Sequence, residues 1–166
     1  YIYDTAIYGL LQQNFLKDMI SVNGGARYTH NSEYGGFTAW QTGAAVRPFE
    51  KTKVYTNIAK GFKLPDIRQY FVKMNPATNT IFETGTDLKP ETYTSAEVGI
   101  TQELLDRISV NIAGFRIYSK DQFVYQNNAW TNAPDFNYNG AEAGVTVKAF
   151  EWLSVSAGYS YIANKQ

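Results

Sequence analysis

Apolar and polar side chains alternate with a period of two in four separate segments of this chain. In residues 141–149 the alanines and valines at the odd positions form one face, and polar residues with one glycine form the other. The same alternation occurs in residues 20–29 and 153–161 and, over a shorter stretch, in residues 96–101. Strict alternation over about nine residues is typical of a β-strand with one apolar and one polar face. We therefore expect a strand in each segment.

Less regular alternation in four further segments brings the expected number of strands to about eight. These segments are residues 6–16, 37–49, 53–62 and 107–118. In the last of them Phe115 and Ile117 fall on the opposite face from Ile108 and Val110. Such a change of parity predicts a β-bulge or a buried strand end.

Short and long connections alternate along the chain. The short connections are residues 16–19, 49–52, 104–107 and 150–152, and the longer ones are residues 31–36, 63–91 and 119–137. This order predicts an all-β fold, an antiparallel up-and-down meander with tight turns at one end and long loops at the other. Transmembrane β-barrels of bacterial outer membranes follow this plan, with tilted strands of about 10 residues.

A membrane-spanning barrel turns its apolar strand faces toward lipid and its polar faces toward the lumen. We expect outward positions at Ile20, Val22, Val145, Val147, Leu153 and Val155, and inward positions at Thr146, Lys148, Ser154 and Ser156. Near the strand ends, where interfacial aromatic girdles form, lie Tyr28, Trp152, Tyr159 and Tyr161. A small soluble ligand-binding β-barrel with packed tyrosines is the alternative interpretation of the same pattern.

The composition excludes several other classes of protein. Aromatic residues make up 16% of the chain, yet the mean hydropathy is −0.35, and no stretch approaches the roughly 18 apolar residues of a transmembrane helix. Acidic and basic residues cancel, so no charge excess points to nucleic acid. Cysteine is absent and His30 is the single histidine. We therefore expect no catalytic residues, no metal site and no cofactor.

Motifs in the second half of the chain resemble those of TonB-dependent outer-membrane receptors. Residues 61–65 read GFKLP, residues 85–91 read GTDLKPE, residues 97–99 read EVG, and residues 137–145 read NYNGAEAGV. They are similar to the family's G-F-[RK]-x-P, N-P-x-L-K-P-E, E-x-G and N-x-G-x-A-x-x-x-G-V-E patterns. The residues that carry the first three motifs are Gly61, Phe62, Pro65, Leu88, Lys89, Pro90, Glu91, Glu97 and Gly99.

The resemblance implies a function as well as a fold. Family members are 22-stranded barrels that hold an N-terminal plug domain and import scarce nutrients with energy from the TonB complex. Residues 1–166 are therefore expected to be a fragment of the β-barrel domain, a partial barrel of about eight strands without plug domain or TonB box. The expected partners are outer-membrane lipid, a nutrient chelate such as a ferric siderophore, and the plug domain and TonB complex of the full-length protein.

The long loops hold the candidate ligand-binding residues. Aromatic residues supply stacking surface, and two cations suit an anionic chelate; the set is Arg68, Tyr70, Phe71, Lys73, Phe82, Tyr125 and Trp130. Equally, the loop aromatics could pack the loops against one another. Pro65 with apolar residues at helical spacing predicts a short helix over residues 65–73.

Other functions receive less support. Haem-receptor relatives often carry a ligating histidine in the loop between the first two motifs, but residues 66–85 contain none, and His30 lies in another connection. We therefore interpret His30 as an ordinary loop residue and expect the whole chelate, not its metal, to be recognised. A passive outer-membrane pore or an adhesin is an open alternative, and a barrel enzyme would need a histidine partner that the sequence does not offer.

Overall fold

The computed structural model of the chain describes residues 2–66, 69, 74–75, 80–81, 88–126 and 129–165. Eight long strands dominate it: β1 (Asp4–Phe15), β2 (Ile20–Asn31), β3 (Gly35–Phe49), β4 (Thr52–Lys63), β7 (Glu91–Leu104), β8 (Ile108–Lys120), β11 (Phe136–Phe150) and β12 (Leu153–Lys165). Four short strands lie in the long connections: β5 (Met74–Asn75), β6 (Thr80–Ile81), β9 (Phe123–Gln126) and β10 (Ala129–Asn132).

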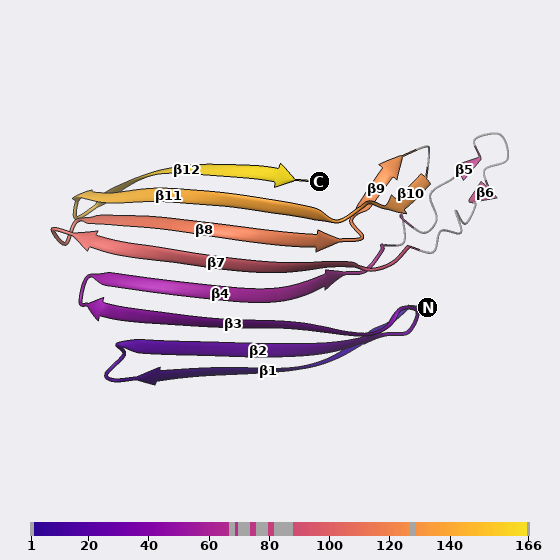
Figure 1. The fold of residues 1–166 in the computed structure, drawn as a ribbon, viewed down its shortest axis with the longest axis horizontal. Helices are drawn as coiled ribbons and strands as arrows, with labels where there is room; N and C mark the ends of the chain where they lie inside the picture. Colours follow the sequence, from indigo (N-terminus) through magenta and orange to yellow (C-terminus); the bar gives the residue numbers. More distant parts are fainter. Residues whose placement is uncertain are drawn as a thin grey trace.

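The long strands form one antiparallel sheet in the order β1-β2-β3-β4-β7-β8-β11-β12, in which sequence neighbours pair. Figure 1 shows the tight turns that follow β1, β3, β7 and β11 at one end of this meander, and the β2–β3 turn with the two long connections at the other. The predicted meander and its partial-barrel form are therefore confirmed. No helix in the described part of the chain is long and apolar enough to cross a membrane.

The pairing register places the apolar positions of neighbouring strands on the same side of the sheet, so that the sheet has one apolar face. Residues directly opposite one another in an antiparallel pair point to the same side. Val145 pairs with Val110 on β8 and with Ala157 on β12, and Val110 pairs in turn with Gln102 on β7, so these four residues form one row across the sheet. The neighbouring row joins Val54, Ile100, Ile112, Ala143 and Tyr159. The predicted outward set and the predicted inward set thus fall on two opposite faces of one sheet.

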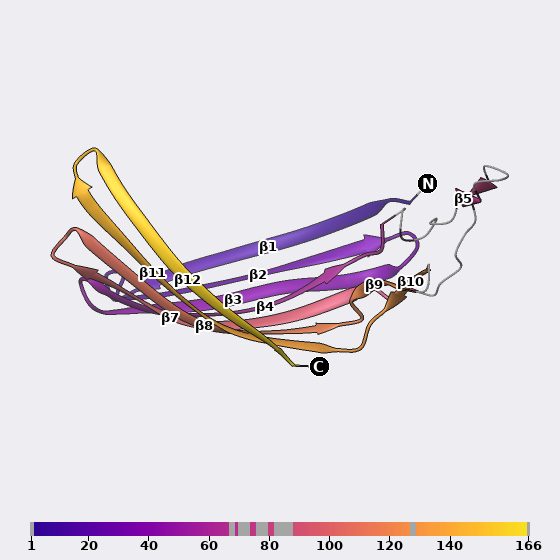
Figure 2. The same ribbon diagram turned by 90° about the horizontal axis from the view of Figure 1, so that it is seen from above.

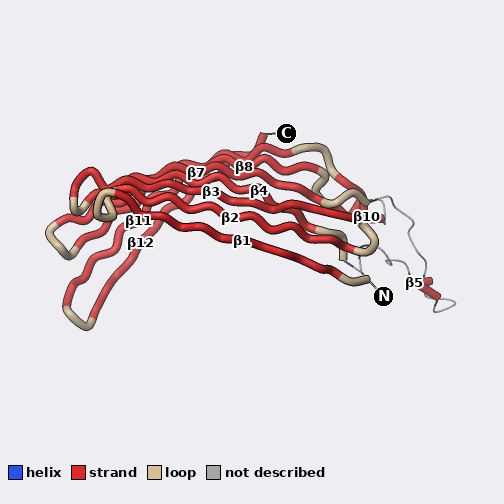
Figure 3. Tube along the Cα trace, turned by 90° about the horizontal axis from the view of Figure 1, so that it is seen from below, coloured by secondary structure: helices blue, strands red, loops and turns tan. Residues whose placement is uncertain are grey.

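The polar face is the concave one. The sheet curves along its width, as Figures 2 and 3 show. Two hollows of about 670 Å³ and 470 Å³ lie on it, formed mainly by side chains of polar-face positions. The first is lined by Asn23, Lys53 and Tyr55 among others, and the second by Arg27 and Tyr93. The apolar residues of the convex face stay exposed: Val98, for example, is 58% exposed.

The predicted bulge near Phe115 is wrong. Strand β8 pairs with β7 and β11 without a register shift, so Phe115 and Ile117 lie on the concave face. Phe115 pairs directly with Gly140, and its ring occupies the space that a Cβ at Gly140 would need. The parity of Phe115 therefore reflects a lumen-side aromatic that covers a glycine of the next strand.

Two bulges occur among the described strands, and each turns a phenylalanine beside a short turn toward the apolar face. The register shifts between Val46 and Phe49 in β3 and between Lys148 and Phe150 in β11. The extra residue places Phe49 opposite Thr52 and Phe150 opposite Leu153, on the apolar face. Because Pro48 has no N–H to give to a ladder, it fits the first bulge.

The rings of Phe49 and Phe150 lie at the edge of the apolar face that is nearest the short turns. Phe150 stacks on Trp152 with ring centroids 5.5 Å apart, and both are exposed. Phe15 and Phe49 occupy the corresponding ends of β1 and β3 and are exposed as well. The short-turn edge therefore carries a row of aromatic side chains directed away from the concave face.

Spin labels at positions 145 and 146 test the two faces. In lipid or detergent, a label at Val145→Cys should be reached by oxygen, which concentrates in the apolar phase, and a label at Thr146→Cys by a water-soluble nickel chelate. Adjacent strand residues face opposite sides, so the two labels should give opposite results. Equal accessibility at both positions would show that the register is wrong.

Candidate functional site at the loop end of the sheet

Two of the predicted ligand residues meet in the β9–β10 hairpin. Tyr125 and Trp130 are directly paired across the hairpin, with ring centroids 5.5 Å apart and an interplanar angle of 59°. Tyr125 is 52% exposed. The pair therefore offers a stacking surface at the long-loop end. The other predicted ligand residues, Arg68, Tyr70, Phe71, Lys73 and Phe82, lie outside the described residues.

The side chain of Asn132 fastens this hairpin to the family motif. Its Oδ1 accepts the Lys89 N–H at 2.9 Å, and its Nδ2 donates to the Lys89 carbonyl at 2.9 Å and to the Asp121 carbonyl at 2.6 Å. The side-chain amide of Asn132 thus makes with the Lys89 backbone the two hydrogen bonds that a paired β-strand residue would make. Beside this junction Leu88 is only 5% exposed. Asn132 was not among the residues predicted from the sequence, because no local pattern distinguishes it from the other loop asparagines.

A reciprocal cap follows the first motif. The Asp66 Oδ1 accepts the Gln69 N–H at 2.9 Å, and the Gln69 Oε1 accepts the Asp66 N–H at 2.8 Å. This is the hydrogen-bond pattern of a capping box, which the sequence D-x-x-Q could have revealed. Asp66 is thus the cap, and Pro65 precedes it, which corrects the prediction that Pro65 takes the first helical position. The remainder of the predicted helix lies outside the described residues.

Cations and aromatic rings meet where the strands enter these loops. The Lys63 Nζ lies 5.5 Å from the centroid of the Phe123 ring, which joins the end of β4 to the hairpin. On β8 the Tyr118 hydroxyl donates to Asp135, and Lys120 lies 3.9 Å from the same carboxylate. The loop end therefore combines exposed aromatic surface with positive charge.

The motif glycines accommodate tyrosines of the facing strand. Gly99 pairs with Tyr55, and a Cβ added at Gly99 would lie 2.5 Å from the Tyr55 ring. Gly61 pairs with Tyr93 in the same way, with a closest approach of 2.7 Å. The Tyr55 hydroxyl also accepts a hydrogen bond from Asn111 at 3.4 Å. These glycines therefore let tyrosine rings lie flat against the wall.

The motif carboxylates belong to the concave face, as expected. Glu97 pairs with Asn57, and Glu91 pairs with Lys63, on the same side as Gly99. Glu97 and Glu91 are half-buried there. Within the described residues no three histidine, cysteine or acidic side chains are close enough together to hold a metal ion.

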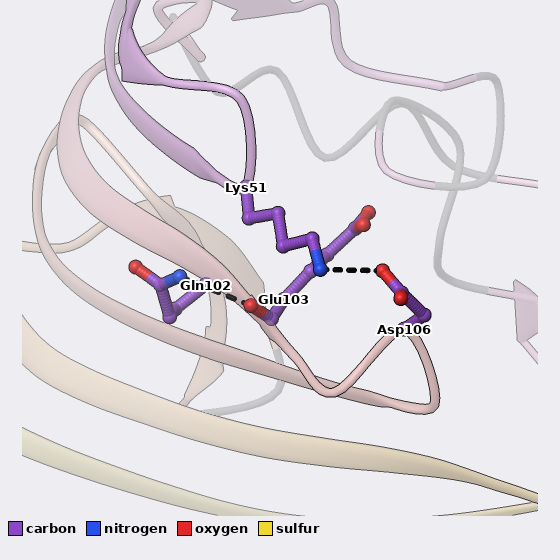
Figure 4. Close-up of polar contacts among 4 residues, drawn as sticks. All are labelled: Lys51, Gln102, Glu103 and Asp106. Atoms are coloured by element: carbon purple, nitrogen blue, oxygen red, sulfur yellow. Dashed lines mark hydrogen bonds and ion pairs between the residues drawn. The ribbon is translucent and has the colours of Figure 1, made fainter.

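The opposite end of the sheet carries an ion pair between neighbouring turns. The Lys51 Nζ lies 2.5 Å from the Asp106 carboxylate, as Figure 4 shows. The hydrogen bond and charge of Asp106 raise the pKa of Lys51, and the hydrogen bond from Lys51 lowers the pKa of Asp106. Leu105 and Asp106 have positive φ angles of 53° and 54°, which give this connection its tight reversal.

This architecture defines the class of protein: a segment of wall from a β-barrel with an apolar outer face, a polar inner face and long loops at one end. The model of the TonB-dependent receptor-like β-barrel family matches residues 2–166. The chain therefore belongs to the TonB-dependent receptor family, as the resemblance predicted. The family consists of receptors and transporters, not enzymes.

Individual relatives are distant. The chain is 24% identical over 140 residues to the vitamin B12 transporter BtuB of Vibrio vulnificus, covering 82% of this chain and 21% of that protein. The siderophore receptor PirA of Pseudomonas aeruginosa superimposes with a TM-score of 0.84 at 20% identity, over 99% of this chain and 35% of PirA. The ferric enterobactin receptor PfeA of the same organism, in complex with enterobactin, gives 0.77 at 18%, over 98% and 27%. The chain thus spans about a fifth to a third of these relatives.

Alanine substitutions test the glycine–tyrosine pairs. Gly99→Ala and Gly61→Ala should each lower the free energy of unfolding by about 1–3 kcal/mol, because a rigid ring or the strand must shift. Gly144→Ala is the matched control, since the nearest atom to its added Cβ is the Ala157 carbonyl oxygen at 3.9 Å. Urea unfolding of the barrel measures all three. Equal unfolding midpoints in the three variants would contradict this role of the motif glycines.

The Lys51–Asp106 pair predicts a pH-dependent contribution to stability, which is small because both side chains are exposed. The lowered pKa of Asp106 means that its contribution is present above the ordinary carboxyl pKa and lost as pH falls through the lowered value. The raised pKa of Lys51 means that its contribution is lost as pH rises through the raised value.

The difference in urea midpoint between wild type and Lys51→Met should therefore be largest near neutral pH and vanish at both extremes. Lys17→Met, in another short turn, is the control and should show no such profile. A Lys51→Met difference that does not change with pH would show that the variant acts through packing and not through the ion pair.

Proposed function

We propose that this chain is part of the barrel wall of a bacterial outer-membrane receptor that imports a metal chelate, such as a ferric siderophore, with energy from the TonB complex. In this proposal residues 1–166 belong to the barrel domain, and the plug domain and the TonB-binding segment belong to the rest of the full-length protein. Membership of the family supports transport. The aromatic and cationic loop end supports an anionic chelate as the substrate.

The dimensions of the apolar face support the membrane location. On β11 the outward side chains are apolar from Ala141 to Phe150, and polar residues begin at Asn139. A strand of this length, tilted by about 40°, spans roughly 25 Å along the membrane normal, which equals the apolar band of outer-membrane barrels. A soluble barrel would have to leave this continuous apolar surface in water, which soluble proteins avoid.

The single observation that carries the ligand proposal is the Tyr125–Trp130 pair. It stands at the long-loop end, with Tyr125 exposed and Trp130 half-buried, and it is fastened by Asn132 to the motif segment that follows the longest loop. Flat rings stack on the aromatic or planar groups of a chelate, and Lys63 with the loop residues Arg68 and Lys73 supplies positive charge. Recognition of the whole chelate needs no metal ligand from the protein.

Two changes in the full-length receptor test this function. Tyr125→Ala combined with Trp130→Ala should lower uptake of an ⁵⁵Fe-labelled siderophore at limiting concentration by roughly tenfold, from the loss of stacking. Deletion of residues 67–84 should abolish uptake. Trp152→Ala, at the opposite end of the sheet, is the control and should transport normally.

Heat-modifiable gel mobility separates a binding defect from a folding defect. All three variants should show the shift of an assembled barrel, because none removes a long strand. Uptake at the wild-type rate by an assembled deletion variant would show that this loop only packs and does not bind the nutrient.

A further inference from the structure

The β9–β10 hairpin is a separate two-stranded sheet that short links join to the wall. Strand β8 ends at Lys120 and β9 begins at Phe123, so the link before the hairpin consists of Asp121 and Gln122. Asp121 has a left-handed backbone with a φ of 55°, which bends the chain where it leaves the wall. The direction of the hairpin therefore has to be fixed by contacts beyond its own two strands.

The side chain of Asn132 supplies these contacts. In the part of the chain that the structure describes, every hydrogen bond between β9 or β10 and the rest of the protein is made by its amide. Two of the three bonds go to the Lys89 backbone and one goes to the Asp121 carbonyl. The same amide thus holds the bend at Asp121 and ties the hairpin to the segment that enters β7.

The face of the hairpin that carries Asn132 is aromatic. Directly opposite residues of an antiparallel pair share a face, and so do alternate residues of one strand. Phe123 pairs with Asn132, and Tyr125 pairs with Trp130, so the four side chains lie on one face. Because Asn132 makes its bonds from this face, they turn the aromatic rings toward the ends of β4 and β7.

A cation lies at the base of this aromatic face. The Lys63 Nζ, at the end of β4, is 5.5 Å from the centroid of the Phe123 ring. Glu91 pairs with Lys63 in the β4–β7 ladder, yet among the described residues no carboxylate lies within ion-pair distance of this ammonium group. The positive charge is therefore available to an anion that approaches the rings.

We propose that Asn132 is the positioning residue of the ligand site. Its amide holds the rings of Phe123, Tyr125 and Trp130 in one direction, with the Lys63 ammonium at their base. A planar anionic group of a chelate can then stack on the rings while the cation meets its charge. Asn132 acts through the rings, because its three hydrogen bonds already occupy its own amide. The inference rests on the proposed function, in which the aromatic pair binds the chelate.

The contact requires an amide. Asn132 accepts one hydrogen bond through its oxygen and donates two through its nitrogen. Asn132→Asp keeps the size and the acceptor, but it loses both donors and places a carboxylate oxygen beside the carbonyls of Lys89 and Asp121. Asn132→Ala loses all three bonds. Both variants should release the hairpin, whereas Tyr138→Phe removes a nearby hydrogen bond to Gln122 and should not.

The first measurement follows the hairpin without any ligand. Spin labels at Val124→Cys, in β9, and Val98→Cys, on the convex face of β7, report the distance between hairpin and wall in the full-length receptor. Double electron–electron resonance should give one narrow distance distribution in the otherwise wild-type protein and with Tyr138→Phe, and a broad one with Asn132→Ala or Asn132→Asp. Equally narrow distributions in all of these proteins would overturn the inference.

The second measurement separates positioning from ligand contact. Uptake of ⁵⁵Fe-labelled enterobactin, a catecholate chelate, gives KM and the maximum rate for the full-length receptor. Asn132→Ala should raise KM about fivefold, as for the net loss of one hydrogen bond, and leave the maximum rate unchanged. In a receptor that already carries Tyr125→Ala and Trp130→Ala, it should raise KM by less than about twofold, because no aromatic pair is left to position.

The outcomes distinguish the positioning role from the proposed function. An equal effect of Asn132→Ala in both backgrounds would overturn the positioning role, because the residue would then act without the aromatic pair. A wild-type KM in the variant that lacks Tyr125 and Trp130 would contradict the proposed ligand surface itself. A wild-type receptor that does not take up this probe would contradict the proposed substrate class, and the spin-label distances would still decide whether Asn132 fixes the hairpin.

Discussion

The antiparallel register is the constraint on which the rest of this structure depends. Because side chains alternate with a period of two, a slip of one residue on any strand would exchange its apolar and polar faces. The register holds across all eight long strands, and its two shifts fall beside short turns. A wall of this kind also pairs the backbone groups of each inner strand with its neighbours, which a lipid environment requires because it offers no water as a substitute partner.

Local departures from regular strand structure determine which side chains lie on each face of the sheet. The bulges move Phe49 and Phe150 from the lumen side to the outer side, so that the apolar band ends in aromatic rings. The glycines at 61 and 99 lie under tyrosines on the concave face. The tight turns keep one end compact, and the other end is left to the long loops, where Asn132 joins two of them through a single side chain.

Alternation predicted the strands and their faces because it is a local property that the register preserves, and the short turns predicted that neighbouring strands pair. Parity alone was misleading at Phe115, because the sequence does not show that Gly140 lies opposite and leaves space for its ring. The bulges could not be predicted either, since they depend on the pairing of two strands. At the loop end, residue type singled out Tyr125 and Trp130 as candidates but did not predict that they pair, and the Asn132 contact joins segments 43 residues apart and has no local signal.

Quenching of tryptophan fluorescence by brominated lipids tests whether the convex face contacts lipid, because the chain has three tryptophans at three different kinds of position. Variants of the full-length protein with one tryptophan left in this region should show strong quenching of Trp40, which lies on the convex face. Trp130, in the hairpin beyond the strands, should not be quenched. Quenching of Trp130 without quenching of Trp40 would contradict this orientation of the sheet, because it would place the loop end in lipid and the convex face away from it.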